Sequence, residues 1–268
     1  MSSSTRERPA LPLYLTDASR AAAGYGLYLT AAPLLRALSS GDGHPVLVLP
    51  GLMTDDLCTR PLRRTLRILG YQAHGWRLGR NIGPTARAVD GMRDRLDDLC
   101  QRHGRPVSVI GWSLGGIFAR NLARRTPASV RQVITLGSPF RMANSNQSRA
   151  HRQFERYSHL HVERLELPLE ADRSALPVPA TSIWSRLDGI VDWQACREIP
   201  GARAENIAVL GSHLGLGHHP AVLYAVADRL AQPEGSWRPF RAPVALRPLF
   251  PSPDQQAASR PFGAASVS

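Results

Sequence analysis

Ser113 lies at the centre of a Gly-x-Ser-x-Gly pattern that directly follows the apolar run VSVIGW. A serine hydroxyl can act as a nucleophile when a tight turn exposes it at a sheet edge and the next helix points its N-terminal NH groups toward it. Such a turn needs neighbours without side-chain bulk, and Gly111, Gly115 and Gly116 meet that need. The pattern predicts a nucleophilic Ser113 between a strand and a helix.

A nucleophilic serine requires a base that accepts its proton and a carboxylate that orients the base. Asp188 follows the predicted strand at 180–185, and His213 follows the predicted strand at 205–211. Because reacting groups gather beyond the carboxyl ends of strands in an open α/β sheet, we expect both side chains at the edge that carries Ser113. The sequence therefore predicts a Ser-His-Asp triad.

Three nearby residues compete for these roles. Asp192 could replace Asp188 as the carboxylate, but it lies farther from the strand end, where a group is held less rigidly. His218 and His219 compete with His213, but they precede a proline that begins the last predicted helix, where capping or surface packing accounts for them. We therefore prefer Asp188 and His213.

A tetrahedral intermediate needs two NH donors for its oxyanion. The NH of Leu114, directly after the serine, is one candidate. The second is expected after the strand that ends at Pro50-Gly51, where the NH of Leu52 is the leading candidate and that of Met53 the next. The alternative is that Pro50-Gly51 forms only a turn.

Short apolar runs alternate with amphipathic segments over most of the chain, which predicts βαβ units and a mostly parallel sheet of about six strands with helices on both faces. The predicted strands are 45–50, 71–78, 107–112, 130–137, 180–185 and 205–211, and the predicted helices are about 14–38, 62–69, 84–102, 114–126 and 220–231.

The same alternation divides the chain into three parts: a helical lead-in over 1–40, a catalytic domain over 41–231, and a proline-rich, mostly irregular tail over 232–268. Residues about 141–178 interrupt the alternation. This insertion is predicted to hold one amphipathic helix, whose spaced apolar and aromatic positions are Phe154, Tyr157, His161 and Leu165.

Five segments, in this order, carry a resemblance: PVLVLPGLMTDD, VIGWSLGG, ITLGSPF, SRLDGIVDW and GSHLGLGHHP. Between Pro45 and Leu230 the chain resembles an α/β-hydrolase of the esterase and lipase group. The resemblance implies a Ser-His-Asp mechanism without a cofactor, and it makes the 141–178 insertion a small helical cap or lid. Two features depart from it: many relatives carry His-Gly where this chain has Pro50-Gly51, and larger relatives begin with two more strands where this chain predicts a helix.

The resemblance implies a serine carboxylester hydrolase that acts on a small-molecule or lipid acyl ester. We expect Met53, Trp112 and the apolar residues of the insertion to form walls around the acyl group. An acyltransferase or a thioesterase could use the same triad. A catalytically silent basic binding protein is a third reading, but the sequence contains no nucleic-acid-binding module.

Composition excludes several other classes. With 268 residues, 43% hydrophobic and 20% charged, the chain is neither a small disulfide scaffold nor globally disordered. The three cysteines form no CxxC pair, the histidines form no metal-binding pattern such as HExxH, and no run approaches 18 apolar residues. We expect a cytoplasmic protein without a bound metal or a transmembrane segment.

The net charge of +12 comes from 33 Arg and no Lys. Residues 60–131 contain 15 Arg against 4 acidic residues, whereas the rest of the chain is nearly balanced. This distribution predicts a basic outer surface around a roughly neutral site, with weak association of the 60–131 region with anionic surfaces and no specific nucleic-acid partner.

Overall fold

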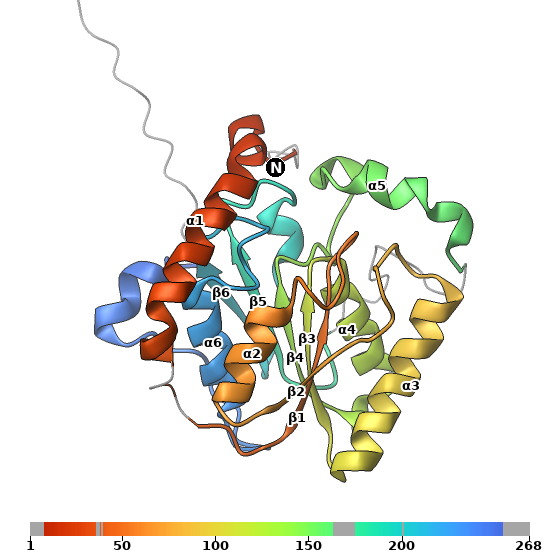
Figure 1. Cartoon of the computed structure of the whole chain (residues 1–268), viewed down its shortest axis with the longest axis vertical. Coiled ribbons are helices and arrows are strands. Elements are labelled where there is room, and N and C mark those ends of the chain that lie inside the picture. Colours follow the sequence, from red (N-terminus) through yellow and green to blue (C-terminus); the bar gives the residue numbers. More distant parts are fainter. Residues whose placement is uncertain (1–7, 36–37, 39, 163–174, 200, 254–268) are drawn as a thin grey trace, which may run out of the picture.

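The computed structural model describes residues 8–35, 38, 40–162, 175–199 and 201–253 (Figure 1). Six strands form one entirely parallel sheet in the order β2-β1-β3-β4-β5-β6. The strands are β1 (Pro45–Leu49), β2 (Gln72–Gly75), β3 (Val107–Trp112), β4 (Val130–Leu136), β5 (Ala180–Ser185) and β6 (Ala204–Val209). The fold class predicted from the alternating runs is confirmed, and each predicted strand coincides with an observed one.

Helices cover both faces of the sheet. Val46 and Val48 of β1 pack on the face covered by α2 (Arg60–Ile68) and α6 (Pro220–Leu230). Leu47 and Leu49 point to the opposite face, which α3 (Ala86–His103) and α4 (Leu114–Arg125) cover. Because successive side chains of a strand point to opposite faces, a strand buried on both faces has a continuous apolar sequence.

Helix α1 (Leu11–Leu35) is a single helix of 25 residues that runs along α6 toward the upper edge of the sheet in Figure 1. Its inward side is a stripe of buried residues at helical spacing, Asp17, Ala21, Gly24 and Tyr28. The exposed side is largely apolar and includes Leu15, Leu27 and Leu29. No helix among the described residues is both long enough and apolar enough to cross a membrane.

The insertion after β4 contains a shorter helix than its spacing predicts. α5 spans only His151–Arg156, and a 3-10 turn follows at Ser158–Leu160. The segment then becomes extended, because the imidazole of His161 contacts the carbonyl of Ile82 at 2.9 Å and the NH of Val162 donates to Pro84. Leu165, the last predicted position of that helix, lies outside the described residues.

Residues 232–253 follow α6 without a strand or an α-helix, and a 3-10 segment spans Val244–Leu249. Phe240 and Phe250 stack edge to face with ring centroids 4.9 Å apart, and both approach Tyr224 of α6. The described part of the tail is thus fastened to α6 by aromatic contacts.

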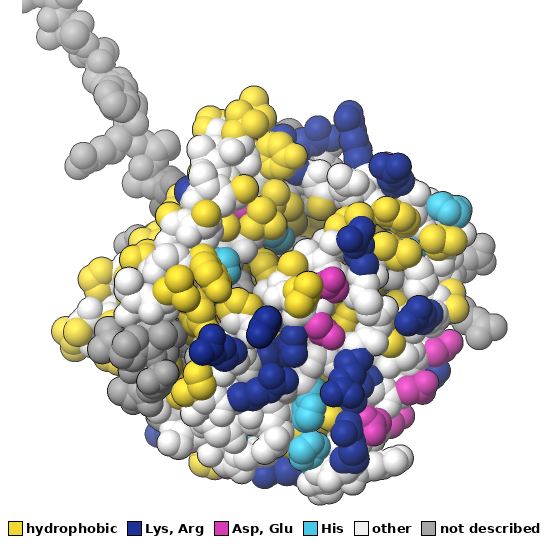
Figure 2. Space-filling view, in the orientation of Figure 1, with side chains coloured by type: hydrophobic (Ala, Val, Ile, Leu, Met, Phe, Trp, Pro, Cys, Tyr) yellow, Lys and Arg dark blue, Asp and Glu magenta, His cyan; other side chains and the backbone are white. Residues whose placement is uncertain are grey.

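Arginine side chains gather over α2 and toward α3 in Figure 2. This is the region in which the sequence predicts the basic surface. Apolar side chains follow the upper part of α1 in the same view.

The ion pair between Arg120 and Glu198 is buried. The guanidinium of Arg120 on α4 forms a bidentate contact with the carboxylate of Glu198, and each side chain is 1% exposed. The Arg120 guanidinium also stacks on the Phe140 ring, 3.8 Å from its centroid.

We expect Glu198→Gln to lower the free energy of unfolding by about 3 kcal/mol, because it removes the charge of a buried carboxylate that the Arg120 guanidinium binds. The matched control is Asp90→Asn, which removes an exposed pair with Arg93 and should cost less than about 0.5 kcal/mol. Urea denaturation measures both variants. Equal losses of unfolding free energy in the two variants would show that the buried Arg120–Glu198 pair contributes no more to stability than a surface pair.

Candidate active site

Ser113 occupies the turn between β3 and α4 in a strained conformation. Its φ of 53° and ψ of −121° lie where a residue with a side chain is rarely found. The Ser113 NH donates to the carbonyl of Leu136 at 2.8 Å, and its carbonyl accepts from the NH of Gly116 at 3.0 Å. These two bonds fix the turn, and the side chain lines a pocket beyond the strand end.

The glycines around Ser113 are required by close backbone approach. A Cβ on Gly111 would lie 2.2 Å from the carbonyl oxygen of Gly115, and a Cβ on Gly115 would lie 2.4 Å from that of Leu49. On Gly116 it would lie 1.9 Å from the Ser138 hydroxyl. The first two contacts are with backbone, which cannot move aside as a flexible side chain can.

Asp188 and His213 contact each other beyond the ends of two neighbouring strands. Their loops follow β5 and β6, and the Nδ1 of His213 lies 2.6 Å from the Oδ2 of Asp188. The other carboxylate oxygen accepts from the NH groups of Ile190 and Val191, both at 2.8 Å. Both side chains are buried, so the carboxylate is fixed toward the imidazole.

The surroundings of His213 favour its protonated form. Burial alone would lower the pKa of the imidazole, but the charge of Asp188, its hydrogen bond and the more distant charge of Asp17 outweigh burial and raise the pKa above the usual value near 6.5. A base with such a pKa accepts a proton readily near neutral pH.

The three competing residues have other roles in the structure. Asp192 accepts from the side-chain amide of Gln147 at 2.7 Å and from the NH of Gln194. His218 contacts the carbonyl of Ala21 at 2.9 Å, and His219 caps α6. None of these contacts involves the Asp188–His213 pair.

One hydrogen bond joins the residue before Ser113 to the backbone of this pair, and the close approach of Gly137 places the end of β4 beside it. The indole NH of Trp112 donates to the carbonyl of His213 at 3.2 Å. Gly137 directly follows β4 and lies close to the pair. A Cβ on Gly137 would lie 3.2 Å from both Asp188 Oδ2 and His213 Nδ1. The three residues predicted from the sequence are therefore gathered at one edge of the sheet.

A mostly apolar pocket opens at Ser113. The residues that line it come from the loop after β1, the start of α4, the insertion and the loop after Asp188, namely Leu52, Ser113, Leu114, Ile117, Pro139, Met142, Ser148, Ala150, His151, Phe154 and Val191. Residues of the insertion thus share a mostly apolar pocket with Ser113.

Both leading candidates for the oxyanion donors line this pocket. The NH of Met53 is already used, since it donates to the carbonyl of Asn81 at 2.7 Å. The Asn81 side chain in turn donates to the carbonyl of Pro50 at 2.8 Å and holds the loop. A Cβ on Gly51 would lie 3.2 Å from the Ser113 Cβ, so Pro50-Gly51 is more than a remote turn. Leu52 and Leu114 remain the candidates.

Met53 and Trp112, which the sequence places in the acyl-binding wall, do not line this pocket. Trp112 is buried on the α6 face of the sheet, where its ring packs on Gly217. Met53 sits in the loop with a φ of 61°. Met142 and Phe154, which line the pocket, belong to the apolar residues of the insertion that the sequence places in that wall. His151 also lines it and was missed, because no spacing rule fixes the path of the insertion.

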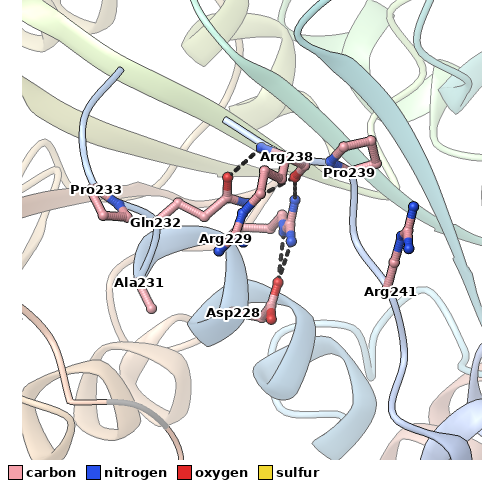
Figure 3. A pocket seen from close by; sticks show the side chains of 8 residues that line it. All are labelled: Asp228, Arg229, Ala231, Gln232, Pro233, Arg238, Pro239 and Arg241. Carbon is pink, nitrogen blue, oxygen red and sulfur yellow. Dashed lines mark hydrogen bonds and ion pairs between the residues drawn. The ribbon is translucent and has the colours of Figure 1, made fainter. Parts of the chain in front are cut away.

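A wider hollow of about 630 Å³ lies at the end of α6, where Arg229 pairs with Asp228 and binds the carbonyl of Arg238 (Figure 3). Its lining contains no nucleophile and no histidine. Within the described residues, no three His, Cys, Asp or Glu side chains converge as metal ligands.

Solved structures resemble the chain over most of its length, although no family model and no curated protein matches its sequence. One is a metagenome-derived lipolytic enzyme from the pair LipS and LipT, with a TM-score of 0.53 and 15% identity over 72% of this chain and 95% of that one. A thermophilic esterase from Thermogutta terrifontis gives a TM-score of 0.52 and 17% identity over 72% and 92%. The chain has the α/β-hydrolase fold.

A third α/β-hydrolase structure, Aspergillus fumigatus lipase B, gives a TM-score of 0.54 and 16% identity. The alignment covers 76% of this chain and 58% of the lipase, so the chain spans just over half of that protein's length.

We expect Gly111→Ala to destabilise the α/β-hydrolase domain by about 3 kcal/mol or to prevent its folding, because the added methyl group meets backbone that cannot move. Gly26→Ala is the matched control. Its Cβ meets nothing within 4 Å on helix α1, and it should stabilise by about 0.5–1 kcal/mol. Thermal unfolding of both variants measures the difference. A Gly111→Ala variant as stable as the wild type would contradict the close approach.

Proposed function

We propose that the protein is a serine hydrolase of carboxylic esters in which Ser113 is the nucleophile, His213 the general base and Asp188 the residue that orients it. The Asp188–His213 hydrogen bond carries this proposal, because it orients a buried imidazole at the sheet edge where Ser113 occupies a strained turn. Similar solved structures named as lipolytic enzyme, lipase and esterase support the reaction class.

In the proposed reaction, Ser113 Oγ attacks the ester carbonyl carbon while the Nε2 of His213 takes the hydroxyl proton. The carbonyl π electrons move to oxygen, and the NH groups of Leu52 and Leu114 stabilise the resulting oxyanion. Collapse of this intermediate breaks the C–O bond, and His213 protonates the departing alcohol. A water molecule then attacks the acyl carbon while His213 takes its proton. Collapse breaks the bond between the acyl carbon and Ser113 Oγ, His213 returns the proton to Oγ, and the carboxylic acid leaves.

The pocket suggests how the substrate is oriented. Ile117, Met142 and Phe154 provide apolar surface on one side of Ser113, which suits the acyl part of an ester. A cytoplasmic location and weak association of the 60–131 region with anionic surfaces stay predictions.

Ser113→Ala should lower kcat/KM for nitrophenyl esters at least about 1,000-fold, because only binding and oxyanion stabilisation remain. A fluorophosphonate probe should label the folded wild type and leave the variant unlabelled. Ser138→Ala is the matched control. Ser138 is buried behind the turn, so we expect no label on Ser138 itself, either in the wild type or in Ser113→Ala. Undiminished ester turnover in Ser113→Ala would refute the proposal.

We expect kcat/KM to fall as the pH drops through the pKa of His213, because only the neutral imidazole can accept the proton. The raised pKa places this acidic limb above about pH 6.5. Asp188→Asn removes the charge and misorients the ring, so the limb should move to lower pH and the rate should fall at least about 100-fold. Initial rates between pH 5 and pH 9 measure both effects. An unchanged limb in Asp188→Asn would contradict the assignment of the pair.

A further inference from the structure

Helix α1 brings one more carboxylate to the site from the other end of the chain. Asp17 is 1% exposed and accepts three backbone hydrogen bonds. Its Oδ2 accepts from the NH of Gly189 and from the NH of His213, both at 3.0 Å, and its Oδ1 accepts from the NH of Leu214 at 2.9 Å. One side chain therefore binds the residue after Asp188 and the backbone of His213 itself.

The two loops held by Asp17 are those that supply the acid and the base. Gly189 belongs to the loop after β5, and His213 and Leu214 belong to the loop after β6. Arg20, one turn later on α1, reinforces the first contact, because its guanidinium donates to the carbonyl of Leu187 at 2.8 Å. Because the backbone of both loops is hydrogen-bonded to Asp17, the His213 imidazole has little freedom to turn away from the Asp188 carboxylate.

We propose that Asp17 is a positioning residue that joins the Asp188 and His213 loops and fixes the imidazole of His213 for proton transfer. This inference rests on the proposed function of the triad. It assigns to helix α1 a part in the site, in addition to its packing against α6.

The electrostatic effect of Asp17 distinguishes positioning from simple packing. Among the described residues, the charged groups that act on the imidazole are Asp188, from the β5 loop, and Asp17, from α1. Both negative charges favour the imidazolium and raise the pKa of His213 against the opposing effect of burial. Neutralising Asp17 should therefore lower that pKa, whereas loosening α1 elsewhere should not.

Helix α1 has further anchors that allow this comparison. Ala21 accepts a contact from the His218 imidazole at 2.9 Å, and the buried Tyr28 packs in the cluster that contains Leu62 and Leu66 of α2. Tyr28 lies about three turns along the helix from Asp17, and its hydroxyl lies 3.5 Å from the Pro61 carbonyl and 3.5 Å from the Thr65 hydroxyl, both on α2. Tyr28→Leu is thus a variant that weakens the docking of α1 without changing the charge near His213.

Asp17→Asn keeps the size of the side chain but replaces one acceptor oxygen by a donor and removes the charge. We expect kcat/KM for a nitrophenyl ester to fall about 10- to 100-fold through kcat, with KM nearly unchanged, because the base is misaligned while the pocket stays intact. The acidic limb of the pH profile should move to lower pH. Tyr28→Leu should lower the melting temperature as much or more, yet leave the limb in place and kcat within about 3-fold.

A second variant and a measurement on the wild type keep the test decisive if Asp17→Asn folds poorly. Asp17→Glu retains the charge but displaces the carboxylate, so kcat should fall while the acidic limb stays close to its wild-type position. In the wild type, amide hydrogen exchange at Gly189, His213 and Leu214 should be slow for loop residues.

The inference is overturned if Asp17→Asn has the wild-type kcat and pH profile, if Tyr28→Leu shifts the limb equally, or if the three amides exchange at the rate of open loops. These failures differ from failure of the proposed function. In the latter case Ser113→Ala retains its ester turnover, whatever the result for Asp17.

Discussion

The pairing of β5 with β6 is the constraint on which the site depends. Asp188 lies three residues beyond the end of β5, and His213 lies four residues beyond the end of β6, so their contact requires that Ser185 and Val209 end the two strands in register. A slip of this register would displace one loop by a residue and lengthen the 2.6 Å contact beyond hydrogen-bonding reach. The burial of both strands resists such a slip, because it would turn apolar side chains such as Ile183 and Ile207 out of their layer.

The Ser113 turn adds a steric requirement to this register. β3 can enter α4 through a strained serine only because the backbones of Gly111, Gly115 and Leu49 approach to distances that no Cβ permits. Gly137 extends the same requirement to the next strand, where the backbone passes beside Asp188 and His213. The packing around Ser113 thus maintains its strained backbone conformation, which fixes the position of the hydroxyl at the pocket.

Local patterns were sufficient to predict the sheet and the three triad candidates. Fully buried parallel strands have continuous apolar runs, as in VSVIGW, and functional side chains follow such runs directly, which favoured Asp188 over Asp192. Contacts between distant segments could not be predicted in this way. Asp17 is separated from His213 by 196 positions, and its only signal in the sequence is that it is the one acidic residue on the 25-residue helix α1. The path of the insertion, which brings His151 to the pocket, had no such signal.

Detection of the covalent intermediate tests most directly whether Ser113 is the nucleophile. The protein is mixed with a nitrophenyl ester, quenched in acid within milliseconds and digested, and the peptides are analysed by mass spectrometry. We expect the peptide containing Ser113 to gain the mass of one acyl group, and the adduct to disappear as the acid product forms. Ester turnover without an adduct on that peptide, or with the adduct on another residue, would contradict the assignment of Ser113 as the nucleophile.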